Sequence, residues 1–449
     1  MADEAARTEI VKTSEPSLRY AWYVVMVLTA TYTLSFVDRQ IISLLVGPIK
    51  DDMGISDFEI SLLQGMAFAL FYTILGIPLG RLADRKSRKI IIATGVAIWS
   101  FMTVVCGLAR NYTQLFLARM GVGVGEAALS PAAYSMISDY FPRHKLATAL
   151  SVYFMGVYVG SGLAFIFGGL VIDWVAGAGQ VILPLVGEIA AWQLTFIIVG
   201  LPGILFVLLV WSIKEPKRRG RLKEEGSVIP LSDSFAFLWQ RKSLYLPIFI
   251  ALGFHTLFGY ASASWMPEFY IRLFDMTRSD VAYIYGFIVL VGSGGGVIMA
   301  GMLSDKLEAR GVRHAKLAII IGAMTIMFPF AFIQPHITSV EGSFAMLAVT
   351  ALMTGMPYGI TAAILQLVTP NEMRGFVTAT YLFTINIIGL GFGPSITAAF
   401  TDFLFQDPML LNWSLSLTAL VSIPAAAIIL IFALKPYNRA LREAESWNA

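Results

Sequence analysis

The sequence predicts an all-α membrane protein in which twelve transmembrane helices form two repeats of six. Three observations support this fold class. The 449 residues are 57% hydrophobic and only 14% charged, whereas soluble domains carry about 25% charged residues. Apolar stretches of bilayer-spanning length recur along the chain. Two short polar sequences also recur at matching places in its two halves.

Each apolar stretch accounts for one membrane-spanning helix. The stretches match or exceed the roughly 20 residues that cross a bilayer, and the longer ones imply tilt. In chain order, the predicted spans are 20–46, 57–82, 89–110, 113–140, 145–174, 190–213, 244–272, 279–304, 315–333, 341–368, 373–401 and 411–435.

The longest charged segment divides these spans into six and six. Within it, Leu231–Trp239 either forms a short helix on the membrane surface or belongs to an ordinary linker. The predicted parts are an N-terminal tail over 1–19, a bundle over 20–213, a linker over 214–243, a second bundle over 244–435 and a C-terminal tail over 436–449.

Matched landmarks indicate that the halves are repeats. Gly80–Asp84 (GRLAD) follows the second span, and Gly301–Asp305 (GMLSD) follows the eighth. Tyr140–Arg143 (YFPR) precedes the fifth span, and Thr369–Arg374 (TPNEMR) precedes the eleventh. Parallel repeats with a site between them at mid-membrane are typical of transporters.

The basic residues predict the orientation. They gather in the loops after the second, fourth, sixth and eighth spans, while the alternate loops hold few, such as Lys50 and Arg110. Because basic loops stay in the cytoplasm, we expect both termini there, in the inner membrane if the protein is bacterial. The clusters include Arg81, Arg85, Lys86, Arg88 and Lys89, then Arg143 and Lys145, then Lys214, Lys217, Arg218, Arg219, Arg221 and Lys223, and finally Lys306, Arg310, Arg313 and Lys316.

Composition argues against several other classes of protein. The net charge of +3 is too small to favour nucleic acid as a partner. The single cysteine, Cys106, allows no internal disulfide and no cysteine metal site. We find no zinc-binding spacing, no nucleophile elbow and no phosphate-binding loop. The sequence therefore predicts no enzyme, no metal and no cofactor.

Four charged residues lie deep inside predicted spans. Asp38 and Arg39 are adjacent in the first span, and Arg119 and Glu126 lie in the fourth. At about 1.5 Å per helical residue, all four fall in one band near mid-membrane. We expect either pairs, Arg39 with Glu126 and Asp38 with Arg119, or one network. Buried charges in a span mark ion or substrate pathways, so Asp38 and Glu126 are candidates for proton coupling and Arg39, Arg119 and Glu126 for substrate binding.

The C-terminal half would form a different wall of a cavity between the two halves. Its spans hold few ionisable groups and instead present aromatic and small polar side chains. A cavity charged on one side and apolar on the other suits an amphiphile with a polar head. The candidate substrate-binding residues on this wall are Tyr260, Ser264, Trp265, Tyr358, Tyr381 and Asn386.

One motif resembles a known superfamily. Gly80–Lys89 has the sequence GRLADRKSRK, which resembles G-x-L-A-D-R-x-G-R-K of the major facilitator superfamily, with Ser87 in place of the second glycine. The resemblance implies the major facilitator fold and a latch that closes the cytoplasmic side. Carboxylates favour helix N-termini, so we expect Asp84 near Arg374 and Asp305 near Arg143 or Lys145. The predicted latch residues are Gly80, Asp84, Arg85, Arg88, Arg374, Asp305 and Arg143.

A branch of that superfamily is a closer match. Ser35–Arg39 (SFVDR) and Gly123–Ala127 (GVGEA) resemble the first and fourth helices of the Spinster branch. That branch is associated with proton-linked movement of lysolipids and sphingolipids. The resemblance implies that Asp38 and Arg39 couple protons and bind the substrate head, and that Glu126 is the partner of Arg39.

The sequence thus predicts a secondary active transporter that moves an amphiphilic, lipid-like anion with protons by alternating access. Its partners are the lipid bilayer, the small amphiphilic substrate and protons, and we expect a monomer. One alternative keeps the fold but moves a small organic acid or sugar-like solute. An alternative of another class is a non-transporting membrane sensor.

Overall fold

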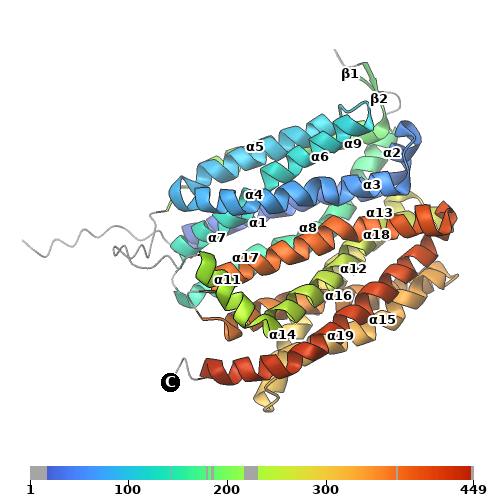
Figure 1. Ribbon diagram of the computed structural model, residues 1–449. Helices are drawn as coiled ribbons and strands as arrows, with labels where there is room; N and C mark the ends of the chain where they lie inside the picture. The colour runs from blue at the N-terminus through green and yellow to red at the C-terminus, as the bar shows by residue number, and fades with distance from the viewer. Residues whose placement is uncertain are drawn as a thin grey trace, which may run out of the picture.

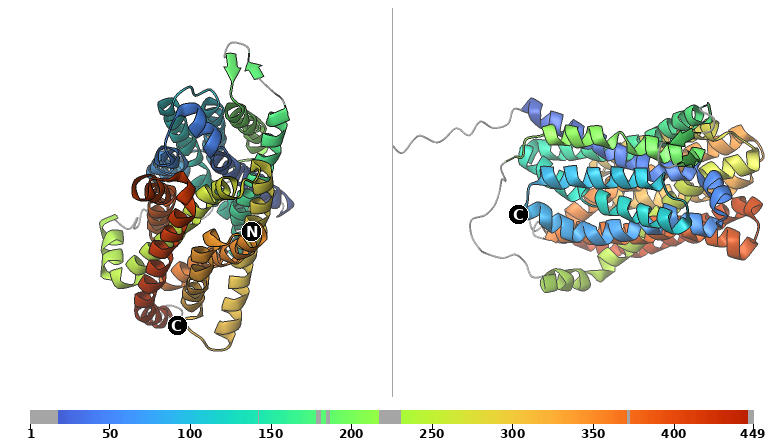
Figure 2. Two further views of the ribbon diagram at one scale, coloured as in Figure 1. Left: turned by 90° about the vertical axis from the view of Figure 1, so that its right-hand side faces the viewer. Right: turned by 90° about the horizontal axis from the view of Figure 1, so that it is seen from above.

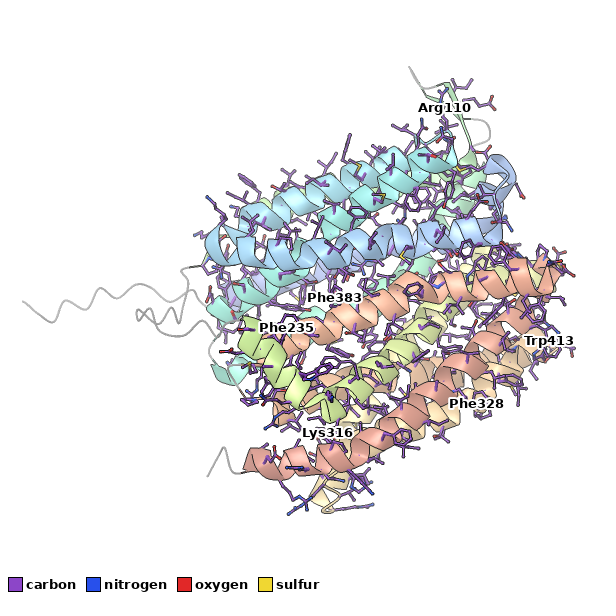
Figure 3. The ribbon with its side chains drawn as sticks, in the orientation of Figure 1. Arg110, Phe235, Lys316, Phe328, Phe383 and Trp413 are labelled. Atoms are coloured by element: carbon purple, nitrogen blue, oxygen red, sulfur yellow. The ribbon has the colours of Figure 1, made fainter. Side chains whose placement is uncertain are left out.

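The computed structural model describes residues 18–141, 143–177, 181–183, 187–216, 231–370 and 373–445. These residues form long helices that run roughly parallel to one axis (Figure 1). We call the end of the bundle where α1 begins and α19 ends the near end, on the left in Figure 1, and the opposite end the far end. In Figure 3, Arg110 and Trp413 mark the far end.

The N-terminal half contains the first six membrane crossings and one hairpin at the far end. The antiparallel strands β1 and β2 pair Val181 with Ile189. The elements are α1 (Leu18–Gln40), η1 (Ile41–Leu44), α2 (Val46–Met53), α3 (Asp57–Gln64), α4 (Met66–Arg85), α5 (Arg88–Cys106), α6 (Tyr112–Glu126), α7 (Leu129–Tyr140), α8 (Arg143–Gly177), β1 (Val181–Leu183), β2 (Gly187–Ile189), α9 (Ala191–Gly200) and α10 (Gly203–Ser212).

The C-terminal half lies beside the first, as the view from the far end shows (Figure 2, left). Its elements are α11 (Leu231–Gln240), α12 (Lys242–Phe274), α13 (Arg278–Ile288), η2 (Val289–Ser293), α14 (Gly294–Ala309), α15 (Ala315–Ile333), η3 (Gln334–His336), α16 (Val340–Val368), α17 (Arg374–Ile385), η5 (Asn386–Gly391), α18 (Phe392–Ala399), η6 (Phe400–Phe405), η7 (Pro408–Leu410) and α19 (Leu411–Glu445).

The predicted twelve crossings are confirmed. Among the described residues, eleven helical stretches are long and apolar enough to span a membrane. The remaining crossing is α6 followed by α7, which a turn at Ala127–Ala128 interrupts. The glycines of α6 allow close packing here, because a Cβ at Gly123 would lie 2.6 Å from the Phe68 carbonyl oxygen. Close contact with α4 and α5 holds the charged residues of α6 inside the half.

Three features differ from the sequence-based expectation or refine it. The β1–β2 hairpin was not expected. The last helix continues to Glu445, so the predicted tail over 436–449 is helical for most of its length. The linker does contain a helix, α11, which carries Phe235 (Figure 3). The Phe235 side chain is 61% exposed, yet its ring packs edge-on against that of Phe376 on α17.

The two halves are packed together at the far end. One apolar core fills the N-terminal half and continues into the far part of the C-terminal half, through residues such as Trp265 and Tyr285. A second core fills only the rest of the C-terminal half. The backbones also meet directly, since a Cβ at Gly162 of α8 would lie 2.8 Å from the Gly286 carbonyl oxygen of α13.

Candidate functional site

The four charged residues predicted from the spans meet inside the N-terminal half. Asp38 and Arg39 lie in the last turn of α1, and Arg119 and Glu126 lie on α6. Asp38 and Arg119 are fully buried, and Glu126 is 2% exposed. The four residues therefore come together, while their common depth near mid-membrane stays a prediction. Charged groups so deep in a bundle require partners, and the contacts show which of them have one.

Arg39 and Glu126 form the expected ion pair. Both Nε and Nη2 of Arg39 approach Oε2 of Glu126, at 2.7 and 2.6 Å. The guanidinium also lies 4.5–4.8 Å from the ring centres of Phe36, Phe68 and Tyr72. Aromatic faces attract a cation, most strongly where water is excluded. Arg39 is therefore held by one carboxylate and three rings.

Asp38 and Arg119 do not form the expected side-chain pair. Arg119 donates from Nη1 to the main-chain oxygen of Asp38 at 3.1 Å and from Nε to that of Leu63 at 3.3 Å. Its Nη2 and both carboxylate oxygens of Asp38 are buried without a hydrogen-bond partner. The Asp38 side chain still interacts electrostatically with Glu126 and Arg119. The four charged residues thus form one network, in which Arg119 donates its hydrogen bonds to main-chain oxygens.

A narrow cavity lies beside this network, between the two halves. Arg39 opens onto it from the N-terminal half, and Tyr260 and Ser264 of α12 face it from the C-terminal half. It therefore brings one predicted charged residue and two predicted polar residues together. Three further polar residues of this cavity were not singled out from the sequence. The complete lining is Arg39, Gln40, Ser43, Gln64, Phe68, Tyr260, Ser264 and Leu390.

The other predicted residues of the C-terminal wall lie outside this cavity. Trp265 is fully buried, and its indole nitrogen donates to the Pro394 carbonyl oxygen at 2.9 Å. Tyr358 faces Tyr158 of the N-terminal half, with ring centres 6.3 Å apart. Tyr381 packs against Phe249, and Asn386 is half-buried at the start of η5.

An unexpected ion cluster joins the halves at the far end. Asp57, the buried first residue of α3, accepts hydrogen bonds from Nη1 and Nη2 of Arg272 on α12, at 2.6 and 2.8 Å. Lys50 also pairs with Asp57, and Glu268 accepts from Arg272 Nε at 2.8 Å. A fork-to-fork contact between arginine and carboxylate is among the strongest polar contacts. We call Asp57 and Arg272 the far-end clamp.

Two more carboxylates join the halves beside the clamp. Asp402 of η6 lies at the far end of the bundle. It accepts a hydrogen bond at 2.6 Å from the backbone N–H of Phe58, in the first turn of α3. Asp173 near the end of α8 accepts from the hydroxyl of Ser279, in the first turn of α13, and from that of Tyr283, in the second turn. Each carboxylate thus meets a helix N-terminus of the other half, where a negative charge is favourable.

The predicted near-end latch is only partly visible. The side chains of Asp84, Arg85 and Arg143 lie outside those that the structure describes. Gly80 faces Pro131, because a Cβ there would lie 3.6 Å from the proline Cβ. Two predicted latch residues belong to the C-terminal half. Asp305 is exposed on α14. Arg374 donates from Nε to the Thr369 carbonyl oxygen at 3.1 Å.

Arg88, also predicted for the latch, is bound within its own half. The fully buried guanidinium pairs with Asp139 of α7 and with Glu215, which follows α10, and donates to the carbonyl oxygens of Ser135 and Pro216. Partial burial opposes ionisation of Glu215, yet hydrogen bonds from Lys89, Arg88 and Ser87 outweigh it and lower its pKa.

Replacing Arg88 should destabilise the N-terminal half. Arg88→Gln removes the cation of the buried Arg88–Asp139 pair, a change that costs about 3–5 kcal/mol. We expect a clear fall in melting temperature of the purified protein, whereas Lys306→Gln, which removes an exposed cation, should have little effect. Because the Glu215 pKa is lowered by folding, its part of the stabilisation is present at neutral pH and fades as the pH falls through that lowered pKa. Equal melting of both variants would contradict this role.

Comparisons with known proteins agree with this geometry. Residues 28–394 match the family model of the Major Facilitator Superfamily. An MFS-type efflux pump of Mycolicibacterium smegmatis is 27% identical over 87% of this chain and 86% of its own. Protein spinster homolog 1 of Xenopus tropicalis is 27% identical over 86% of this chain and 74% of its own.

Solved structures show the same architecture. A bacterial homologue of the human lysosomal transporter Spinster, in an inward-facing and unoccupied conformation, superimposes with a TM-score of 0.75 at 28% identity. The match covers 95% of this chain and 98% of that one. A D-xylose–proton symporter shares the fold, with a TM-score of 0.65 at 14% identity over 91% of this chain and 97% of its own.

Proposed function

Because this chain belongs to the Major Facilitator Superfamily, we propose that it moves an amphiphilic, lipid-like anion across the membrane together with protons. It is a Spinster-like transporter by its relatives and its structural match. In our proposal, the two halves rock about the central cavity, both termini face the cytoplasm, and the far-end clamp closes the opposite side. The central cavity is then closed on the side that faces away from the cytoplasm.

The observation that supports this proposal best is the position of Arg39. Its side chain lines the narrow cavity between the halves, and rocking of the halves would widen this cavity and let an anionic head group approach the guanidinium. Phosphate and carboxylate accept two parallel hydrogen bonds from such a fork. In the present conformation Glu126 occupies this fork. Substrate and Glu126 therefore compete for Arg39, and a protonated Glu126 would release it.

The second part of the proposal assigns the coupling proton. Glu126 is balanced by Arg39, but Asp38 makes no side-chain hydrogen bond although it is fully buried. An ionised carboxylate is very costly in such a place, whereas a neutral carboxyl group is far less so. Of the two candidate acids, Asp38 is thus the one that carries a proton in this conformation.

A flux measurement tests the proposed function. The purified protein is reconstituted into liposomes, and uptake of a lysophospholipid and of small organic acids is followed with and without an imposed pH gradient. We expect gradient-dependent movement of the lysophospholipid. Movement of organic acids alone would replace the lipid-like substrate by the small-solute alternative. Substrate binding without any flux would favour a membrane sensor.

Replacing Arg39 by lysine should weaken substrate binding. Lysine keeps the charge but cannot copy the two parallel hydrogen bonds of the guanidinium. We expect Arg39→Lys to lower affinity for dodecyl phosphate about tenfold or more while the protein stays folded. Affinity is measured by calorimetry and folding by the melting temperature. A folded variant with unchanged affinity would show that Arg39 does not bind the head group.

A further inference from the structure

We propose that Gln64 selects substrates whose anionic head also carries a hydrogen-bond donor, a hydroxyl or an ammonium group. This inference rests on the proposed function, because it concerns the same cavity and assumes that Arg39 binds the anion. It adds a specificity-determining residue and narrows the class of substrate.

Gln64 stands where the two halves meet. It is the last residue of α3, is 6% exposed and lines the central cavity. Its Nε2 donates across the interface to the main-chain oxygen of Ser264 at 3.5 Å. The next residue, Gly65, packs so tightly that a Cβ would lie 2.6 Å from the Leu390 carbonyl oxygen. These two contacts therefore hold Gln64 in place against the C-terminal half.

The remaining amide oxygen of Gln64 lacks a partner. Its Oε1 is buried and accepts no hydrogen bond. A reversed amide would place that oxygen against the Ser264 carbonyl oxygen, and two acceptors repel, so the amide orientation is fixed. Buried acceptors without a donor are unfavourable and uncommon. This unpartnered acceptor belongs to a residue that lines the cavity between the halves, so it is suited to a donor that arrives with the substrate once the halves move apart.

The neighbouring residues favour a head with more than one polar group. Beside Arg39 and Gln64, four further residues with polar side chains line the cavity: Gln40, Ser43, Tyr260 and Ser264. Apart from Arg39 these groups are uncharged, so they recognise hydrogen-bonding groups and leave charge recognition to the guanidinium. A bare alkyl anion would fill the Arg39 position only and would leave Gln64 unsatisfied.

A matched pair of ligands tests this inference. The first is 1-dodecylglycero-3-phosphate, which has a free hydroxyl next to its phosphate ester. The second is 3-(dodecyloxy)propyl phosphate, which has the same chain and phosphate but no hydroxyl. We expect the wild-type protein to bind the hydroxylated ligand about tenfold more tightly, as one added hydrogen bond in a buried site implies. Affinities are measured by calorimetry in detergent.

Gln64→Leu assigns the preference to Gln64. The variant should bind the two ligands with equal affinity, because the preference depends on the Gln64 amide oxygen. Gln240→Leu, an exposed position at the end of α11, is the matched control and should keep the tenfold preference. If Gln64→Leu does not fold, the wild-type comparison alone decides whether a donor is recognised.

The outcomes separate this inference from the proposed function. Equal binding of both ligands by the wild-type protein overturns the inference but leaves Arg39 as the anion-binding residue. A preference that persists in Gln64→Leu overturns the role of Gln64. Failure of the wild-type protein to bind either ligand overturns the proposed lipid-like substrate and the inference with it.

Discussion

Asp38→Asn should abolish transport driven by a pH gradient while leaving exchange of substrate down its own gradient. Asparagine resembles the neutral form of the carboxyl group in shape and cannot release a proton. Asp38 is fully buried, and its carboxylate has no hydrogen-bond partner in this conformation, in which the halves are joined at the far end. Fixing the neutral form should therefore disturb the fold little and remove only the coupling to protons.

The measurement compares two assays on the same liposomes. One follows uptake under an imposed pH gradient, and the other follows exchange of labelled for unlabelled substrate without a gradient. We expect Asp38→Asn to retain only the exchange, and Asp51→Asn, which alters an exposed carboxylate at the far end, to retain both. Full gradient-driven uptake in Asp38→Asn would exclude Asp38 as the proton carrier. Loss of both activities would instead indicate a structural role.

The helices and the Arg39–Glu126 pair could be predicted from the sequence because each depends on local information. Apolar length indicates a span, and a charge inside a span requires a partner at a similar depth. The side-chain partners of Arg119 could not be predicted so well. The main-chain oxygens of Asp38 and Leu63 take its hydrogen bonds, and any helix offers such oxygens without a sequence signal.

The far-end clamp illustrates what the sequence does not show. Asp57 and Arg272 are separated by 215 positions and lie near span ends, where charged residues are ordinary loop charges. A signal did exist in the repeat: carboxylates end the eleventh and fifth spans at Asp402 and Asp173, opposite the starts of the second and eighth. We expected carboxylates at helix N-termini only at the near end, at Asp84 and Asp305.

The far-end clamp should control which side of the protein is open. Asp57→Asn should shift the protein toward a conformation that is open at the far end. The carboxylate is buried and receives two hydrogen bonds from Arg272 as well as the Lys50 ammonium. Removing one member of such a buried pair costs about 3–5 kcal/mol. Because the pair joins the halves, its loss destabilises only the conformation that is closed at the far end. The population ratio of the far-end-open to the far-end-closed conformation should therefore rise by about a hundredfold or more.

Accessibility of the central cavity from the far side measures this shift. Ser43 lines the cavity and is 1% exposed, so Ser43→Cys in a Cys106→Ala background reports opening to a membrane-impermeant thiol reagent. We expect labelling to be much faster with Asp57→Asn. The control is Asp275→Asn, since Asp275 is exposed one turn from Arg272 and has a positive φ of 53° that asparagine also tolerates.

A purely structural role for Asp57 predicts a different pattern. If the clamp only stabilised the fold, Asp57→Asn would lower the melting temperature of the whole protein without faster labelling at intermediate temperatures. If it holds the halves together, labelling should rise at temperatures well below the melting temperature of the variant. Charge reversal gives a stricter test: Asp57→Arg with Arg272→Asp restores opposite charges across the interface and should slow labelling again. Continued rapid labelling in this double variant would show that attraction between positions 57 and 272 does not close the far end.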